Sequence, residues 1–311
     1  MGLKQILLII CVVLLVITGC VLGGFTQKTT DMTSDPVNYT FKYILYGHPD
    51  EINITLYKGV YIYFSKRDTQ LYVGYEKDTY TEVITNPEQE YYMKNILDAI
   101  KAKSNNTEDQ ARIAINLVQR MNYTVEDEYR VAYPYEVLYR NGGVCSERSI
   151  LLAYLLKNIG YDTVLMGFRN ENHMAVGIKT KPVYTYKNTG YAFIETTNTN
   201  IITYSDGSYP NPKLELYAEQ NIPPEDYPEG YANTTVKLES TPELIPVSSG
   251  MEFNNLSKDY ADAWNYTDLG STPNGTVSPS NYNQWQFINW YYGLHYGDGF
   301  ITYNPLNPIT T

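Results

Sequence analysis

Two short stretches near the start of the chain alternate between apolar and polar residues, which is the period of a half-buried β-strand. They are Tyr39-Thr40-Phe41-Lys42-Tyr43-Ile44-Leu45 and Ile52-Asn53-Ile54-Thr55-Leu56-Tyr57, both rich in β-branched and aromatic residues. The segment His48-Pro49-Asp50 between them consists of residues that favour turns. We therefore predict a small β-rich unit over residues 37–87, preceded by a polar linker at 25–36.

Two amphipathic helices are predicted next, because apolar residues recur there at helical spacing. The first covers residues 88–103 and the second covers 111–121. Their apolar stripes are Tyr92, Ile96 and Ile100 in the first helix, and Ile113, Leu117 and Met121 in the second. Thr107-Glu108-Asp109-Gln110 matches a capping box and is predicted to open the second helix.

The most apolar helix of the chain is predicted to begin at Cys145. The run Ile150 to Leu156 is apolar on all sides, so this helix should lie in the core. Gly160 is well placed to end it in a left-handed conformation. Segments 162–168, 173–180 and 191–197 then read as strands. A helix packed on an antiparallel sheet gives an α+β fold, whose core we assign to residues 88–204.

The composition changes after about residue 205, where Pro, Gly, Ser, Asn and Tyr become frequent. Residues 205–311 contain 13 acidic residues against three lysines, and the whole chain carries a net charge of −11. Such a charge repels phosphate backbones, so nucleic-acid binding is not expected. All three tryptophans lie in this C-terminal extension. The aromatic segment 282–292 is either a latch packed on the core or a platform for sugar or peptide.

The N-terminus has the pattern of an export leader. Lys4 precedes the apolar run from Ile6 to Ile17, and Thr18-Gly19-Cys20 follows it. Residues 1–24 are either a signal that leaves Cys20 lipidated or an uncleaved membrane anchor. Eight N-x-S/T sequons agree with an extracellular, membrane-attached location. They are candidate glycosylation sites at Asn38, Asn53, Asn105, Asn122, Asn233, Asn255, Asn265 and Asn274.

Cys145 is the only cysteine outside the leader, since Cys11 and Cys20 belong to it. One interpretation is a small buried core residue. The alternative is a reactive thiol, because the N-terminus of a helix favours the thiolate. If the strands at 173–180 and 191–197 pair, His173 and Glu195 become neighbours, and the small residues Ala175 and Gly177 leave room for a substrate. Cysteine, histidine and acid then form a candidate catalytic triad.

The other two histidines are weaker candidates: His48 is predicted in a turn, and His295 has no partner near it in the sequence. The chain contains no CxxC, HExxH or Walker motif. We therefore expect no metal and no cofactor.

Several motifs, taken in order, resemble the transglutaminase-like cysteine peptidases, in particular the archaeal and bacterial branch of this papain-related superfamily. The likeness spans residues 85–210. It runs through Val118-Gln119-Arg120-Met121-Asn122-Tyr123-Thr124, Tyr133-Pro134-Tyr135-Glu136-Val137-Leu138, Gly143-Val144-Cys145, Leu156-Lys157-Asn158-Ile159-Gly160-Tyr161, His173-Met174-Ala175-Val176-Gly177 and Tyr191-Ala192-Phe193-Ile194-Glu195-Thr196-Thr197. The resemblance implies Cys145 as nucleophile, His173 as base and Glu195 as the acid that orients the histidine. Two departures are Gly143-Val144-Cys145-Ser146-Glu147, where the branch usually has Gly-Asp-Cys-Glu-Asp, and Glu195, where animal transglutaminases use Asp.

The resemblance and the leader together predict an exported enzyme. It would attack an amide of a peptide or protein, including envelope material, through a thioester. Water as the second substrate would make it a peptidase or amidase, and a lysine amine would make it a cross-linking transglutaminase. The backbone N–H of Cys145, with Gln119 or Tyr123, is the candidate oxyanion site. The alternative class is a non-catalytic surface module for binding or scaffolding on the same fold.

Overall fold

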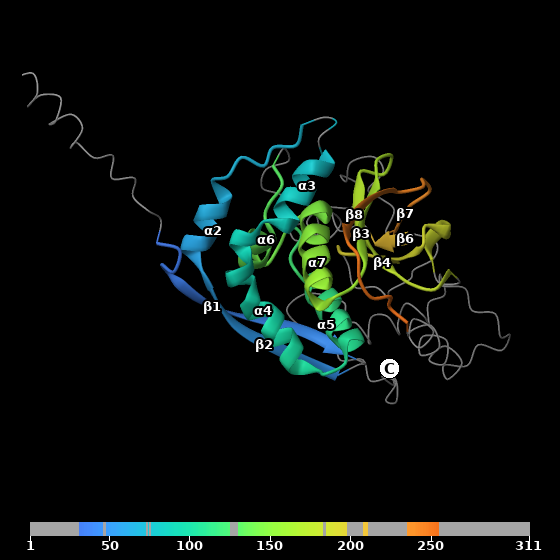
Figure 1. Cartoon of the computed structure of the whole chain (residues 1–311). Coiled ribbons are helices and arrows are strands. Elements are labelled where there is room, and N and C mark those ends of the chain that lie inside the picture. The colour runs from blue at the N-terminus through green and yellow to red at the C-terminus, as the bar shows by residue number, and fades with distance from the viewer. Residues whose placement is uncertain are drawn as a thin grey trace, which may run out of the picture.

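A computed structural model describes residues 31–45, 48–72, 74, 76–124, 130–182, 185–197, 208–210 and 235–254 (Figure 1). These residues form helices together with antiparallel strands, and the predicted α+β class is confirmed. One apolar core connects most of the elements, from Phe41 near the start to Phe253 near the end.

The predicted N-terminal β-unit is a hairpin of β1 (Pro36–Leu45) and β2 (His48–Tyr57). Its inner face buries five apolar side chains against the helices: Phe41, Tyr43, Ile52, Ile54 and Leu56. The predicted position of the turn is wrong, because His48-Pro49-Asp50 pairs with residues 43–45 as part of β2. Pairing between the two strands continues beyond the alternating stretches. It can include Pro49 because a proline is tolerated at the end of a two-stranded ladder.

The second half of the region 37–87 is helical, so the description of this region as β-rich holds only for its first half. Helix α2 (Lys58–Ser65) follows the hairpin directly, and α3 (Glu76–Thr85) comes next. A short 3₁₀ turn η1 (Pro87–Gln89) then leads into α4 (Glu90–Lys103), which confirms the predicted helix at 88–103. The hairpin packs against α4 and α5, so it shares the main core.

Helix α5 (Thr107–Gln119) confirms the second predicted helix, although it begins four residues earlier. The proposed capping box is wrong, because the N-cap is Asn106, whose side chain accepts a hydrogen bond from the backbone N–H of Glu108. Asparagine is among the best N-cap residues, so it takes this position ahead of Thr107. Helix α6 (Pro134–Arg140) starts with a proline at its first position, which is favourable there.

Helix α7 (Cys145–Ile159) is the central element of the fold (Figure 1). It begins at Cys145 and ends at Gly160, which has φ 115° in the left-handed region, as the sequence predicts. Its residues from Ile150 to Leu156 are all buried, which agrees with their apolar character on every side. Contacts with α5, α6, β3 and β4 surround it.

The sheet beside α7 has four antiparallel strands in the order β5-β4-β3-β8. The first three confirm the predicted strands: β3 (Thr163–Phe168), β4 (His173–Lys179) and β5 (Tyr191–Ile194), with the 3₁₀ turn η3 (Tyr186–Asn188) between β4 and β5. Strand β8 (Glu243–Ser248) comes from the region assigned to the C-terminal extension. The core boundary at residue 204 is therefore wrong: Ile245 and Phe253 are buried in the main core.

A second, smaller core covers the other face of this sheet. Its buried members are Val164, Met166, Phe168, Ala175, Tyr186, Phe193 and Leu238. The predicted space beside Ala175 and Gly177 is therefore filled by protein. A Cβ atom on Gly177 would lie 2.6 Å from a methyl group of Val164, so the glycine serves close packing.

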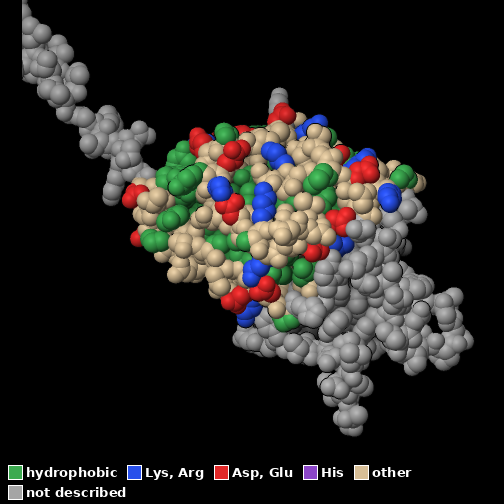
Figure 2. All heavy atoms as spheres, turned by 60° about the horizontal axis from the view of Figure 1, so that its bottom comes forward, with side chains coloured by type: hydrophobic (Ala, Val, Ile, Leu, Met, Phe, Trp, Pro, Cys, Tyr) green, Lys and Arg blue, Asp and Glu red, His purple; other side chains and the backbone are tan. Residues whose placement is uncertain are grey.

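Two further short strands, β6 (Ser208–Pro210) and β7 (Thr235–Lys237), pair with each other. The predicted leader with Cys20, the aromatic segment 282–292 and His295 lie outside the described residues. Within the described ranges, no helix is both long and apolar enough to cross a membrane. Figure 2 brings forward the side that is lowest in Figure 1 and shows basic and acidic side chains interspersed over the described surface.

Candidate functional site

Cys145 stands at the first position of α7, half-buried against the main core. The loop before it lies against residues 122–124: Asn122 pairs with Gly142 in a parallel bridge, and the N–H of Gly143 donates to the carbonyl of Asn122 at 3.1 Å. Helix α6 ends at Asn141, with φ 50°, and not at the glycine pair Gly142-Gly143. The glycines instead permit close approach, since a Cβ on Gly142 would lie 2.9 Å from the carbonyl oxygen of Asn122.

The first turn of α7 is capped by its own Glu147. One carboxylate oxygen, Oε2, accepts from the backbone N–H of Val144 at 3.1 Å, and Oε1 accepts from Nη2 of Arg140 at 2.8 Å. A carboxylate in the first turn also interacts favourably with the helix dipole. Glu147 therefore fixes the loop between α6 and α7, and with it the backbone of Cys145.

His173 and Glu195 are direct partners, as the sequence analysis expected. The Nε2 atom of His173 lies 2.9 Å from Oε2 of Glu195, and both side chains are buried. His173 is the first residue of β4, and Glu195 follows the last residue of β5. The antiparallel pairing of these strands, with Val176 opposite Ile194, brings the two side chains together.

The other carboxylate oxygen of Glu195 accepts three hydrogen bonds from the turn that follows it. Oε1 receives the backbone N–H of Thr196 at 2.9 Å, the N–H of Thr197 at 2.7 Å and the hydroxyl of Thr197 at 2.5 Å. Burial raises the pKa of the Glu195 carboxyl, but the His173 charge and these donors lower it by more. Glu195 is therefore ionised and held in one orientation.

The Cys145 sulfur is the second partner of the His173 ring. Burial raises the pKa of the Cys145 thiol, but the hydrogen bond and charge of His173, together with the backbone N–H of Met174, lower it by more. Burial lowers the pKa of His173, whereas the Glu195 carboxylate and Cys145 raise it, to about 10. Because Nε2 contacts Glu195, Nδ1 is the ring nitrogen left for the sulfur. Both pKa shifts favour a thiolate beside an imidazolium.

Both candidate oxyanion residues lie near this cluster, in different ways. Gln119, the last residue of α5, is buried, and its Nε2 donates to the backbone carbonyl of Glu195 at 2.9 Å. Tyr123 is half-buried and belongs to the segment that lies along the Gly142-Gly143 loop. Gln119 is thus hydrogen-bonded to Glu195, and Tyr123 is next to the loop that leads to Cys145.

Arg148 is an important residue that the sequence analysis did not single out. It is 1% exposed, and its guanidinium donates to the carbonyls of Val118, Gln119 and Thr197 at distances of 2.8 to 3.3 Å. These contacts fix the end of α5 and the turn after Glu195 to α7. Only the position of an arginine three residues after the cysteine, in the first turn of an apolar helix, hints at this role.

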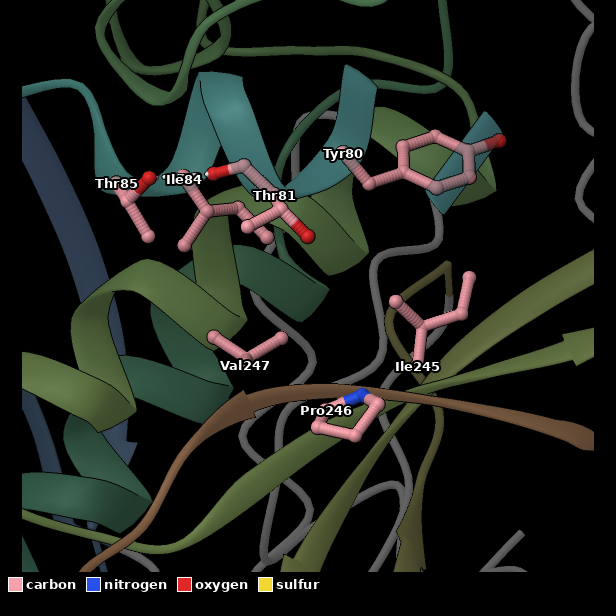
Figure 3. A pocket seen from close by; sticks show the side chains of 7 residues that line it. All are labelled: Tyr80, Thr81, Ile84, Thr85, Ile245, Pro246 and Val247. Carbon is pink, nitrogen blue, oxygen red and sulfur yellow. Dashed lines mark hydrogen bonds between the residues drawn. The ribbon is translucent and has the colours of Figure 1, made fainter. Parts of the chain in front are cut away.

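Helix α3 covers the same end of α7. Burial raises the pKa of Tyr80 in α3 to about 12, and the charge of the nearby Cys145 contributes. A small pocket separates α3 from β8, with Tyr80, Ile84 and Thr81 on one side and Ile245 and Val247 on the other (Figure 3). Tyr80 is therefore a neighbour of the thiol that the sequence did not indicate.

The remaining candidates lie elsewhere. His48 is the first residue of β2, in the hairpin. The sequon residues Asn38, Asn53, Asn105 and Asn122 are exposed. The others, Asn233, Asn255, Asn265 and Asn274, lie outside the described residues. Within the described part of the chain, no cluster of His, Cys, Asp and Glu side chains is suited to hold a metal ion.

Comparison of the chain with protein-family models and with curated proteins gives no match. The fold and the site together define an α+β protein in which a cysteine at a helix N-terminus, a histidine and a glutamate form one hydrogen-bonded cluster.

Proposed function

We propose that this protein is a transglutaminase-like cysteine peptidase or amidase with the catalytic triad Cys145, His173 and Glu195. The observation that carries the proposal is the His173 ring between two partners: Glu195 at 2.9 Å on Nε2 and the Cys145 sulfur on its other side. A nucleophile that contacts a base, oriented in turn by a buried acid, is the arrangement that activates a thiol. A helix that begins at the cysteine and packs on an antiparallel sheet agrees with a papain-like core.

In the proposed reaction, the Cys145 thiolate attacks the carbonyl carbon of an amide. The tetrahedral oxyanion forms, and the His173 imidazolium gives its proton to the departing amine as the carbon–nitrogen bond breaks. A thioester remains on Cys145. His173, now neutral, removes a proton from water, whose oxygen displaces the sulfur, so the products are a carboxylic acid and an amine. Glu195 holds the imidazole in the required tautomer throughout.

The oxyanion would be stabilised by the backbone N–H of Cys145, which has no acceptor within the helix because it is at the first helical position. Gln119 is the better candidate for a second donor, because its amide is held beside the triad by Glu195 and by the contacts of Arg148 with its carbonyl. Loss of one such donor typically costs about 3 kcal/mol in the transition state.

The proposed substrate is a peptide or protein amide on the outside of the cell, where the predicted leader would attach the enzyme to the membrane. A lysine amine in place of water in the second step would convert hydrolysis into cross-linking. Incubation with a peptide-amide substrate and a labelled primary amine separates these outcomes. Free acid without incorporated label indicates a hydrolase, and incorporated label indicates a transferase.

The direct test of the proposed function is labelling with an electrophilic amide probe, followed by mapping of the modified residue. We expect modification at Cys145, slow labelling of His173→Ala, and no labelling of Cys145→Ala at this site. Labelling confined to Cys11 or Cys20 would contradict the proposal, because those cysteines belong to the leader.

A further inference from the structure

Ser149 lies one helical turn after Cys145 and is completely buried. Its hydroxyl contacts the start of β4, which carries His173, and the turn after β5, which carries Glu195. The Oγ atom donates to the carbonyl of Met174 at 3.1 Å and lies 3.1 Å from the hydroxyl of Thr196. Thr196 is also 0% exposed. One buried point therefore joins α7, the start of β4 and the end of β5.

Each partner of Ser149 is the chain neighbour of a triad residue. Met174 follows His173, and its backbone N–H is directed at the Cys145 sulfur. Thr196 follows Glu195, and its backbone N–H donates to Oε1 of that carboxylate at 2.9 Å. Each residue thus has a backbone N–H against the triad. Each also has a second group against Ser149, which is the carbonyl of Met174 or the hydroxyl of Thr196.

The direction of these hydrogen bonds follows from the proton count. A serine hydroxyl has one proton, and Ser149 gives it to the Met174 carbonyl, so Thr196 must be the donor in their shared contact. The carbonyl of Cys145 lies 3.5 Å from the same threonine oxygen and is a weaker second acceptor. The chain of bonds runs from Thr196 to Ser149 to Met174. Inside the core, a group that loses its partner has no water to replace it.

We propose that Ser149 and Thr196 are positioning residues that hold Cys145, His173 and Glu195 at their working distances. This rests on the proposed function, and neither hydroxyl touches the reacting atoms. Without the bridge, the ends of β4 and β5 are free to move relative to the first turn of α7. The contact between the sulfur and the imidazolium then weakens, and a displacement of about 1 Å is enough to lower reactivity strongly.

The test measures the rate at which iodoacetamide modifies Cys145 in the full chain between about pH 5 and pH 9, by mass spectrometry of the peptide that contains it. Thr196→Val and Ser149→Ala remove one hydroxyl each with little change of shape. Thr196→Ser keeps the hydroxyl. Thr180→Val is the matched control, because its buried hydroxyl also donates to a carbonyl, that of Phe253 at 2.9 Å, beyond the far end of β4.

We expect Thr196→Val and Ser149→Ala to lower the modification rate at about pH 6 by about tenfold, which corresponds to a rise of about one unit in the thiol pKa. Thr196→Ser and Thr180→Val should retain the wild-type profile. An unchanged profile in Thr196→Val and Ser149→Ala, beside a reactive wild-type thiol, would overturn the positioning role and leave the proposed function intact. A wild-type Cys145 that reacts like an ordinary thiol would overturn both. If Thr196→Val does not fold, Ser149→Ala compared with Thr180→Val decides.

Discussion

The hairpin and the region around α7 place their polar groups in opposite ways. In the hairpin, apolar side chains face the core, and the polar ones face solvent: Thr40 donates to Asn53, and Thr55 donates to Asn38, on the exposed side. Around the first turn of α7, charged and polar side chains lie inside. Burial of a polar group costs free energy unless the group is hydrogen-bonded. The polar side chains around the first turn of α7 are buried and are held there by specific hydrogen bonds.

We call Arg148, His173 and Glu195, with the groups that they contact, the interior set. Its side-chain contacts join segments far apart in the sequence, whereas the exposed hydroxyls of Thr40 and Thr55 bond only across the hairpin. Arg148 contacts residues 118, 119 and 197, while Glu195 contacts His173 and Gln119. Loss of a side chain there should affect several elements at once. Loss of an exposed hydroxyl on the hairpin should affect only one cross-strand pair.

The largest effect is expected for Glu195→Gln on catalysis. The amide keeps the size of the side chain but stabilises the wrong tautomer of His173, so the rate constant for the chemical step should fall by on the order of 10⁴-fold. Steady-state kinetics with a cleavable peptide amide measures this. Near-normal turnover would show that Glu195 is a structural residue and not part of the triad.

A large effect on stability is expected for Arg148→Met, which removes the guanidinium donor of three buried carbonyl groups. The Val118 carbonyl keeps the backbone N–H of Met121, so the carbonyls of Gln119 and Thr197 are the ones most affected. At about 1–3 kcal/mol for each unsatisfied group, the free energy of unfolding should fall by about 2 kcal/mol or more in a urea titration. Lys94→Met is the control, because Lys94 and Asp98 form an exposed pair on α4, and such pairs contribute about 0–1 kcal/mol. Similar losses in the two variants would contradict the special role of the interior set.

The fold was largely predictable because its elements are marked by local patterns. Hydrophobic periodicity predicts the helix after Cys145 and the three strands that follow it, and Gly160 marks the end of the helix. The α2 and α3 helices were missed, since the tyrosine-rich sequence of α2 has no clear helical stripe. Strand β8 was missed because it lies among prolines and glycines and is specified by its pairing with β3, a contact across about 80 residues.

The site could be predicted only in part for a related reason. The three candidate residues are distinctive types that lie at the ends of predicted elements. Pairing of the two predicted strands brings His173 and Glu195 together, and Cys145 is at the start of the predicted helix beside them. The roles of Arg148, Ser149 and Thr196 depend on which carbonyls and hydroxyls meet in the core. A sequence does not contain those distances, and an arginine or serine in a helix is usually exposed.

An intermediate effect is expected in the pH dependence of stability of Cys145→Ala. In the folded wild type, Glu195 and Cys145 raise the pKa of His173 above its ordinary value of 6.5, and His173 lowers the pKa of Cys145 below that of an ordinary thiol. The folded state therefore gains a proton on His173 and loses one on Cys145, so the two contributions to the pH dependence oppose each other.

Without the thiol, only the His173 contribution remains, because Glu195 still raises its pKa. The unfolded state then binds fewer protons than the folded state, so the free energy of unfolding of Cys145→Ala should decrease from about pH 6.5 to pH 9. Urea titrations across this range measure it. A wild-type protein with the same slope would contradict the thiolate–imidazolium pair.

The smallest effect is expected for Thr40→Val on the hairpin. It removes one exposed hydrogen bond to Asn53 and adds a residue that favours strands, so the free energy of unfolding should change by less than about 0.5 kcal/mol. The same exchange at the buried Thr196 should cost clearly more. Equal costs at the two positions would remove the difference between the hairpin and the region around α7.

The most direct test of the central claim is the reactivity of Cys145 toward iodoacetamide at about pH 6. An ordinary thiol has a pKa near 8.5 and is almost entirely protonated there. If Cys145 is a thiolate paired with His173, it should react much faster in the folded protein than in the denatured chain, and His173→Ala should lose this advantage. A rate equal to that of an ordinary thiol, unchanged in His173→Ala, would contradict the account.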